Sequence, residues 1–430
     1  MRTIRCTEKT LESRIAKLMA DTSLFDAGIA GRTQTIIDAV RVRGDAALIE
    51  FTERFDGARL TPSRLAVSKA ELMTASLQAN ENLRAAVKTA MTNIERFSRR
   101  GLRKAWSIRN PQGGRTGEKF DPFQRVGIYI PGGTAPLVST ALMTVTLARV
   151  AGCPEIVVCT PCGRDGGIHA GLLYAARAAG ATEIYRLGGA QAIAALAYGT
   201  DTLARVQKIF GPGNAYVVMA KRLLFGQVAV DLLPGPSEVL VLADDSAPAH
   251  YVAADLLAQA EHGSGHERVW LVTPSASLLT EVRREIKRQL PNRPRAQLIR
   301  QALENHGWLI AVQNLDQAVR VANLLAPEHC EIMTRQPSRV AEKIVTAGAL
   351  FLGPWSPTVL GDYLAGPSHT LPTGGGGTSF AGLTVDQFQR RTSVVQYDRL
   401  ALRRSLGLVR SFADLEGLEA HGRSAAIRFE

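Results

Sequence analysis

Residues 125–133, RVGIYIPGG, mark the point where the sequence changes from helical to strand-like patterning. Val126, Ile128 and Ile130 fall on one side of a predicted strand, and the Pro-Gly-Gly that follows predicts a turn. From this turn onward, predicted strands alternate with predicted helices. Such alternation is typical of parallel sheets that are covered by helices.

The alternation divides into two halves of similar length. The predicted strands are 125–130, 155–160, 183–187 and 206–210 in the first half, and 238–243, 268–273, 308–312, 331–334 and 349–352 in the second. We therefore expect an α/β fold with two tandem Rossmann-like domains. Neither half has G-x-G-x-x-G after its first strand, so the ordinary dinucleotide fingerprint is absent.

Both ends of the chain differ from these halves. Apolar residues recur at helical spacing within 28–55 and 83–97, which predicts a helical N-terminal segment. Residues 1–24 form a polar arm. Residues 384–430 form a basic, extended tail, which we expect to be mostly helical because it has no strong strand signal.

The composition indicates a folded globular protein, with 46% apolar and 21% charged residues among 430. The net charge of +12 raises the possibility of a nucleic-acid or anionic membrane partner. However, the basic clusters at 96–104 and 283–288 lie in or beside predicted helices, so solvated helix faces are the favoured interpretation. We expect neither nucleic acid nor a membrane as a partner.

The apolar segments and the cysteines of the sequence bear on the cellular location and the redox chemistry of the protein. No segment reaches the roughly 18 apolar residues of a spanning helix, and the first residues lack a signal-peptide pattern, so a cytoplasmic protein is expected. Five cysteines do not suggest a disulfide framework. Cys159 and Cys162 have C-x-x-C spacing, but no second pair completes a four-thiolate zinc site.

Two short motifs in the second half place polar side chains together. Gln259 and His262 are three residues apart at the end of a predicted helix, so their Cβ atoms lie roughly 5–6 Å apart on one face, close enough to share a metal ion. Glu328 and His329 follow another helix and could transfer protons if they face a cleft. From either motif alone, a structural or solvated role is the favoured interpretation.

Further candidates lie in loops and in the tail. Asp362 and His369 follow the last predicted strand, on the side where open α/β sheets bind ligands, and could complete a metal site. Glu416 and His421 lie in the tail, where exposed helical residues are the favoured interpretation. Glycine turns at 129–133, 188–191 and 211–214 follow strands and could bring backbone amides to a phosphate, although tight turns need glycine in any case.

In order along the chain, seven motifs together resemble histidinol dehydrogenases. They are VGIYIPGG (126–133), GGAQAIAALA (188–197), IFGPGN (209–214), GPSEV (235–239), QAEHG (259–263), PEH (327–329) and GDY (361–363). The resemblance covers nearly the whole chain. It implies an enzyme that uses NAD and one zinc ion per subunit to oxidise L-histidinol to L-histidine, the last step of histidine biosynthesis, through a bound aldehyde.

The resemblance also implies roles for individual residues. The zinc ligands would be Gln259, His262, Asp362 and His421, and the catalytic pair would be Glu328 and His329. The same ligands and His329 would contact the substrate, together with Ser237, His369 and Glu416. The NAD contacts would include Tyr129, Gln191 and Asn214. His329 would act as general base and Glu328 would activate water.

Domain organisation and assembly follow from the same resemblance. It implies that 25–128 and 236–383 form a zinc-binding and catalytic domain, that 129–235 forms the NAD domain, and that 1–24 is an N-terminal arm. Residues 384–430 would be a dimerisation tail that reaches into the site of a second copy in a homodimer.

One position departs from the family pattern. Many members have Glu in the loop four residues before the zinc Asp, where this chain has Thr358. Relatives with similar zinc and Glu-His machinery oxidise other small alcohols, including sulfonated diols, so a related dehydrogenase is the alternative function. His369 and Glu416 suit an imidazole and a cationic amine and favour histidinol.

Overall fold

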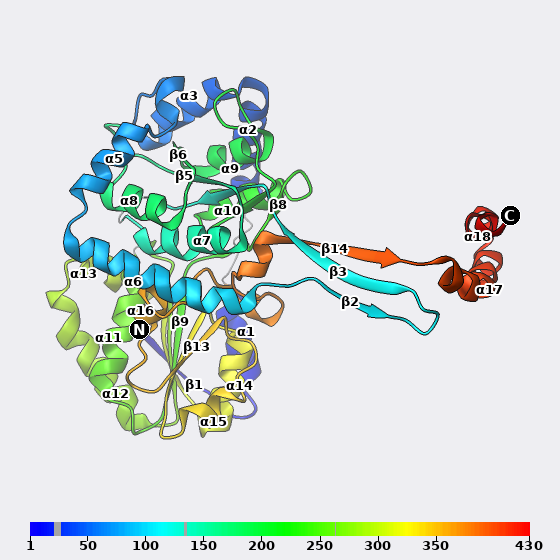
Figure 1. Ribbon diagram of the computed structural model, residues 1–430. Coiled ribbons are helices and arrows are strands. Elements are labelled where there is room, and N and C mark those ends of the chain that lie inside the picture. Colours follow the sequence, from blue (N-terminus) through cyan, green and yellow to red (C-terminus); the bar gives the residue numbers. More distant parts are fainter. Residues whose placement is uncertain (21–26, 133–135, 263) are drawn as a thin grey trace.

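The computed structural model describes residues 1–20, 27–132, 136–262 and 264–430. Two parallel sheets with helical layers and a projecting antiparallel arm make up the chain (Figure 1). The predicted α/β class is confirmed. Three sequence features lie outside the described residues: Gly133 of the first turn, Gly263 after the predicted metal-binding helix, and the boundary between residues 24 and 25.

The first sheet contains the strands predicted from the first half. Its order is β6-β5-β4-β7-β8, with every neighbouring pair parallel, and its strands are β4 (Arg125–Tyr129), β5 (Glu155–Thr160), β6 (Glu183–Arg186), β7 (Lys208–Phe210) and β8 (Ala229–Val230). Alternate residues face opposite cores: Val126 and Ile128 lie in one, Val157 and Cys159 in the other. Burial on both faces explains why these strands are apolar throughout.

The second sheet has six parallel strands in the order β1-β11-β10-β9-β12-β13. They are β1 (Arg2–Arg5), β9 (Glu238–Ala243), β10 (Arg268–Thr273), β11 (Gly307–Ala311), β12 (His329–Met333) and β13 (Ala349–Leu352). The N-terminal arm is therefore no separate segment, because Arg2–Arg5 pairs with β11. Its polar side chains hid this edge strand in the sequence.

Helices cover both faces of the second sheet. One core lies under α11 (Ala249–Ala260), α12 (Ala276–Gln289) and α13 (Ala296–His306), and the opposite core under α1 (Leu11–Ala20), α14 (Leu315–Leu325) and α15 (Pro337–Ala341). A short helix, α16 (Thr358–Tyr363), follows β13. Helix α13 was missed because the sequence prediction placed a single basic helix before β11.

The helices before β4 pack on the first sheet. They are α2 (Ala27–Arg43), α3 (Asp45–Asp56), α4 (Pro62–Leu65), α5 (Lys69–Gln78) and α6 (Glu81–Ser98). Their apolar faces share cores with α7 (Val138–Ala151), α8 (Ala170–Ala179), α9 (Gly189–Tyr198) and α10 (Ala215–Leu223). This packing contradicts the predicted grouping of 25–128 with 236–383. The first sheet also begins at Arg125 rather than at 129.

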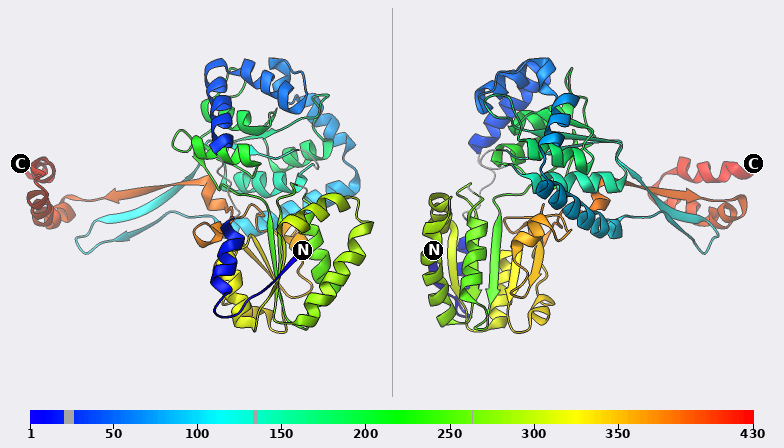
Figure 2. Two further views of the ribbon diagram at one scale, coloured as in Figure 1. Left: turned by 180° about the vertical axis from the view of Figure 1, so that it is seen from behind. Right: turned by 60° about the vertical axis from the view of Figure 1, so that its left-hand side comes forward.

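A three-stranded antiparallel arm projects from the two sheets (Figures 1 and 2). It consists of β2 (Trp106–Arg109), β3 (Arg115–Pro122) and β14 (Gln389–Gln396), and it ends in α17 (Arg399–Glu416) and α18 (Glu419–Ala426). The helical part of the predicted tail is confirmed, but β14 was missed. Most of its side chains are exposed on both faces, so the apolar alternation that reveals a half-buried strand is missing.

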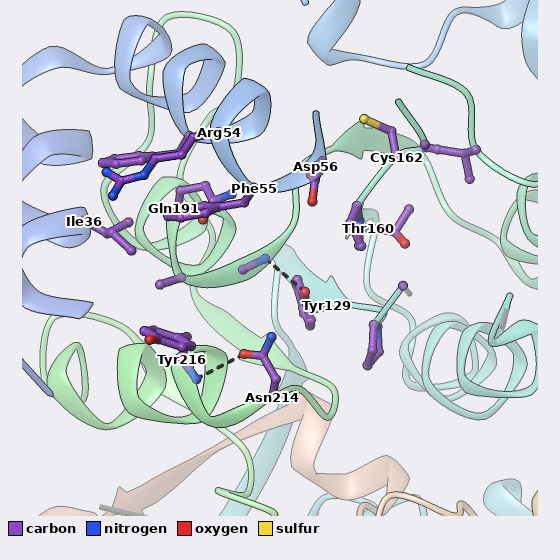
Figure 3. Close-up of a pocket in the computed structure, with 18 of the residues that line it drawn as sticks. Ile36, Arg54, Phe55, Asp56, Tyr129, Thr160, Cys162, Gln191, Asn214 and Tyr216 are labelled. Carbon is purple, nitrogen blue, oxygen red and sulfur yellow. Dashed lines mark hydrogen bonds between the residues drawn. The ribbon is translucent and has the colours of Figure 1, made fainter. Parts of the chain in front are cut away.

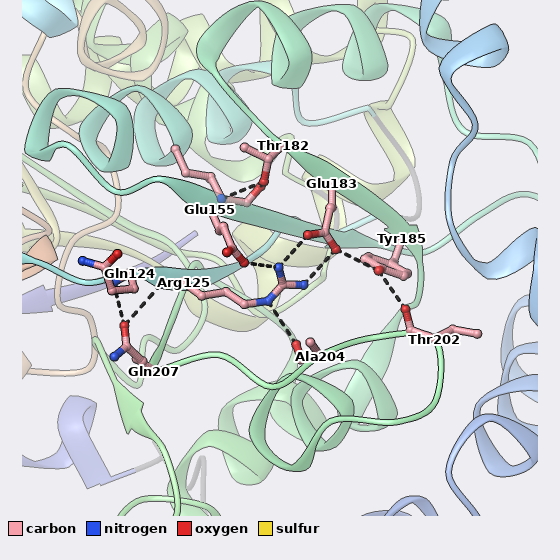
Figure 4. Close-up of polar contacts among 10 residues, drawn as sticks. Gln124, Arg125, Glu155, Thr182, Glu183, Tyr185, Thr202, Ala204 and Gln207 are labelled. Carbon is pink, nitrogen blue, oxygen red and sulfur yellow. Dashed lines mark hydrogen bonds and ion pairs between the residues drawn. The ribbon is translucent and has the colours of Figure 1, made fainter.

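An ion-pair network fixes the amino ends of three strands in the first sheet (Figure 4). The largely buried Arg125 guanidinium reaches Glu155 and Glu183, with Nη1 lying 2.5 Å from a carboxylate oxygen of each. These three residues begin β4, β5 and β6. The network joins neighbouring strands at the edge of the sheet that faces away from the glycine turns.

Two features of the described chain concern membrane spans and disulfides. Among the described residues, no helix has both the length and the apolar composition needed to cross a bilayer. All five cysteines are free, Cys159 and Cys162 among them. The structure therefore contains no disulfide framework.

Candidate active site

A cavity of about 920 Å³ lies at the carboxyl ends of the strands in the first sheet (Figure 3). The three residues predicted to contact NAD, Tyr129, Gln191 and Asn214, all line it. Tyr129 ends β4, Gln191 lies in the first turn of α9, and Asn214 precedes α10. The structure thus brings together three side chains that the sequence separates by up to 85 residues.

The polar groups around this cavity differ in how they are satisfied. The Tyr129 hydroxyl accepts a hydrogen bond from the Gly189 amide at 3.0 Å, and Asn214 Oδ1 accepts from the Tyr216 amide at 3.0 Å. Gln191 is 1% exposed, yet neither polar atom of its side chain has a partner among the described residues. A buried amide without partners is costly, so Gln191 is suited to bind a polar ligand in the cavity.

Sequence reasoning missed the wall that α3 contributes. Arg54, Phe55 and Asp56 from the end of this helix line the cavity, and the Asp56 carboxyl group points toward Tyr129 (Figure 3). Burial raises the pKa of Asp56 to about 6. The predicted domain division assigned α3 to the other half, so nothing in the sequence connected it with the glycine turns.

The predicted catalytic pair lies at the amino end of β12 in the second sheet. Helix α14 ends at Leu325, and His329 is the first residue of the strand rather than part of a helix end. His329 Nδ1 donates to the Glu238 carbonyl oxygen at 2.9 Å, and the Glu238 amide donates to Glu328 Oε2 at 2.8 Å. The first residue of β9 therefore fixes both side chains.

Hydrogen bonding and burial define the protonation of this pair. Because a carbonyl oxygen can only accept, Nδ1 of His329 carries a proton, and Nε2 has no partner within the described part of the chain. Burial lowers the pKa of His329 and favours the neutral ring, with Nε2 as a free base. Burial also raises the pKa of Glu328, and the neighbouring Glu238 and Asp362 carboxylates add to this shift.

Further predicted residues surround the free Nε2 atom. Asp362 Oδ1 lies 3.9 Å from it, and His369 Nδ1 donates to the Asp362 carbonyl oxygen at 3.0 Å. His262 lies close enough for its charge to lower the pKa of both His329 and His369. His262, Asp362 and His369 therefore all lie near the Glu328–His329 pair.

Gln259 and Ser237 border the same place. Gln259 is 4% exposed at the end of α11, and its Nε2 atom has no partner among the described residues. Ser237, just before β9, shares a side-chain hydrogen bond with Glu328. Ser237 therefore lies beside Glu328, and Gln259 lies three residues before His262 at the end of α11.

The position of this cluster differs from the expectation based on open sheets. We expected Asp362 and His369 at the carboxyl edge of the second sheet. Instead, α16 runs back beside β12, so that Asp362 lies near His329 at the amino edge. His369 also contacts Thr140 of α7, with 3.3 Å between His369 Nε2 and Thr140 Oγ1. The cluster therefore lies at a junction between the two sheet units.

Two predicted residues are remote from the cluster. Glu416 ends α17, His421 lies in α18, and both are exposed at the far end of the arm (Figures 1 and 2). Within the described ranges, no three His, Cys, Asp or Glu side chains group as a metal site. Within one chain, His262 and Asp362 lie near His329 and His369, whereas His421 lies at the far end of the arm.

Comparison with known proteins identifies the family of the chain. The histidinol dehydrogenase family model matches residues 21–429. Histidinol dehydrogenase from Heliobacterium mobile is 44% identical over 408 residues, 95% of each chain, and that from Geobacillus kaustophilus is 47% identical over 395 residues, 92% of each chain.

A solved structure extends the likeness to the fold. The histidinol dehydrogenase from Elizabethkingia anophelis superposes with a TM-score of 0.94 at 34% identity, covering 100% of this chain and 98% of the other. The motifs, the fold and the grouped side chains therefore point to one family. The chain belongs to the histidinol dehydrogenases.

Proposed function

We propose that the protein uses NAD and zinc to oxidise L-histidinol to L-histidine, with L-histidinaldehyde as a bound intermediate. The observation that carries the proposal is the buried Glu328–His329 pair, whose free Nε2 atom faces Asp362 at 3.9 Å. The first oxidation gives the aldehyde, NADH and a proton. Addition of water and a second oxidation give the carboxylic acid, another NADH and another proton.

His329 is suited to act as the base for the first oxidation. Its Nδ1 proton is held by the Glu238 carbonyl, so the Nε2 lone pair can accept the proton of a substrate hydroxyl group. The lowered pKa keeps the ring neutral and ready to accept this proton. NAD would accept the hydride that leaves the carbon atom bearing this hydroxyl group.

Glu328 is suited to activate water in the second oxidation. A carboxyl group whose pKa is raised by burial is a stronger base, once ionised, than an exposed one. It would remove a proton from the water molecule that attacks the aldehyde. Its hydrogen bonds with the Glu238 amide and with Ser237 hold it in place for this step.

The donor set fits zinc. His262, Asp362 and Gln259 offer nitrogen and oxygen donors without thiolate, and Gln259 would bind through its amide oxygen. His421 would be the fourth ligand. Zinc held in this way would position the nitrogen atoms of the substrate and polarise its oxygen.

A homodimer would complete the site. Glu416 and His421 are exposed at the tip of an arm that extends away from their own cluster (Figure 1). We propose that these two residues reach the cluster of a second copy. Exposed apolar residues on the same helices, including Phe412 at 65% and Leu415 at 83%, support contact with that copy.

The cavity on the first sheet is proposed as the NAD site. Its volume of about 920 Å³ is suited to a ligand of cofactor size, and it contains the unsatisfied Gln191 amide. The glycine turns at 188–191 and 211–214 border it, so backbone amides of helix N-termini are available to phosphate groups.

The stoichiometry of the reaction tests the function. Purified protein supplied with zinc and excess NAD should form two NADH for each L-histidinol consumed. One NADH would indicate that oxidation stops at the aldehyde. No NADH from histidinol, with rapid NADH formation from a sulfonated diol, would replace the proposal with that of a related alcohol dehydrogenase.

A further inference from the structure

A pair of buried carboxyl groups lies beside α16, apart from the catalytic pair. Glu331 on β12 is 1% exposed, and its Oε1 atom accepts hydrogen bonds from both the amide and the hydroxyl of Thr358, the amide at 2.6 Å. The Glu331 side chain also lies close enough to Asp255 of α11 for each carboxyl group to affect the pKa of the other. None of the steps proposed for the reaction uses these three residues.

The protonation of one carboxyl group explains how Asp255 and Glu331 can lie side by side. Two carboxyl groups buried side by side avoid like-charge repulsion when one of them carries a proton. Burial raises the pKa of Asp255 to about 8, and the nearby Glu331 contributes to this shift. Because Glu331 Oε1 already accepts from the amide and the hydroxyl of Thr358, Asp255 is the carboxyl group better suited to carry the proton.

These contacts determine where α16 lies. The helix has six residues and is too short to be stable alone. Its first residue, Thr358, is bound by Glu331, and its fifth, Asp362, accepts through its carbonyl oxygen from His369 Nδ1 at 3.0 Å. Between them, Gly361 packs against the Phe351 ring, because an added Cβ atom would lie 2.6 Å from a ring carbon. The side chains of Glu331, Phe351 and His369 therefore hold α16 in place.

We propose that Glu331, which is bound to Thr358, is a positioning residue that sets the Asp362 carboxylate for metal binding. This inference rests on the proposed zinc site. Glu331 and His329 are two residues apart on β12 and so point to the same face of the sheet. Strand β12 therefore carries both His329, the proposed base, and Glu331, which supports the helix that holds Asp362. Groups that orient metal ligands typically contribute roughly 10–100-fold to metal affinity.

Substitutions at Thr358 and Glu331 test the role of the contact. Thr358→Val keeps the shape of the side chain but removes the hydroxyl donor, and Glu331→Met removes the acceptor. Thr358→Ser and Glu331→Gln are the conservative partners, because a serine hydroxyl can still donate and a glutamine carbonyl can still accept. Thr334→Val is a matched control: Thr334 is 6% exposed, as Thr358 is, and its hydroxyl has no partner among the described residues.

The main readout is zinc affinity, measured without substrate by competition with a chromophoric chelator. Thr358→Val and Glu331→Met should bind zinc about tenfold or more weakly than the unchanged protein, while the conservative variants and Thr334→Val stay close to it. Excess zinc should restore the kcat of Thr358→Val, since Glu328 and His329 are intact. Thermal midpoints show whether each variant is folded.

The outcomes separate the inference from the proposed function. If the unchanged protein binds no zinc, the proposed metal site is wrong. If it binds zinc and Thr358→Val binds zinc equally tightly, the positioning role is wrong, even if Glu331→Met fails to fold. Loss of kcat in Thr358→Val that excess zinc does not restore would also overturn the positioning role.

Discussion

The Glu238 carbonyl oxygen decides which nitrogen of His329 can act as a base. It accepts from Nδ1 at 2.9 Å, so the proton stays on that side of the ring and Nε2 faces Asp362. The amide of the same residue binds Glu328. Because both contacts are made by the backbone of Glu238, the Glu328–His329 pair is oriented without any demand on the side chain of Glu238.

Asp56 gives a prediction at the scale of one residue. Its pKa is raised from 3.8 to about 6, so the folded state binds this proton more tightly than the unfolded state does. Stability contributed by this group therefore falls as pH rises from about 4 to about 6, and the loss remains above that range. Asp56→Asn should raise the thermal midpoint at about pH 8 and change it little near pH 4.

Melting curves at both pH values check the Asp56 prediction. Asp38→Asn is the control, because Asp38 is an exposed carboxylate on the neighbouring helix α2 and should show no such pH-dependent gain. An equal change of the Asp56→Asn midpoint at both pH values would contradict a desolvated carboxylate at this position.

At the scale of elements, a buried ion pair fixes the turn between β7 and α10. Lys221 Nζ pairs with Asp231 and also donates to the Gly211 carbonyl oxygen at 2.7 Å, while Asp231 Oδ2 accepts from the Gly211 amide at 2.8 Å. Both charged side chains are 0% exposed. The turn that carries Asn214 into the cavity therefore depends on two side chains that lie outside it.

Removing one partner of this pair should be more damaging than removing both. Lys221→Met leaves the Asp231 carboxylate buried without its cation, which should lower the free energy of unfolding by about 3–5 kcal/mol. The double variant Lys221→Met, Asp231→Leu should recover part of this loss. Urea unfolding measures all three proteins, and a double variant no more stable than the single one would rule out the unpaired charge as the cause.

At the scale of the whole molecule, the arm separates two predicted site residues from the rest. The strands β2, β3 and β14 extend from the body, and α17 and α18 lie at their end (Figure 2). Apolar side chains on this arm are exposed, among them Ile108 at 59% and Val395 at 69%. An arm of this kind is stabilised if it packs against a second copy.

Mixing two inactive variants tests whether sites are shared. His329→Asn removes the base from the body, and His421→Ala removes the proposed ligand from the tail, so each homodimer should be inactive. A mixed dimer has one site in which both contributions are unchanged, and random mixing should restore about a quarter of full activity. If the tail served its own body, no site would be intact and mixing would restore nothing.

Local periodicity predicted most of the fold. The strands of both halves lie close to their predicted bounds, because apolar runs such as Val239–Leu242 have the composition of buried parallel strands wherever they pack. The same argument missed β14 and β1, whose exposed side chains give no apolar pattern. It also moved the start of β12 two residues too late, and so placed His329 at a helix end.

The sequence by itself determined the alternation of strands and helices, the glycine turns, and the family to which the chain belongs, because these are properties of short segments and their order. Only the tertiary structure decided which surfaces meet. It placed Asp56 of α3 in the cavity beside Tyr129, and it brought α16 back along β12 so that Glu331 binds Thr358 and Asp362 faces His329. Those contacts join residues far apart in the chain and depend on the packing of whole elements, which no local pattern records.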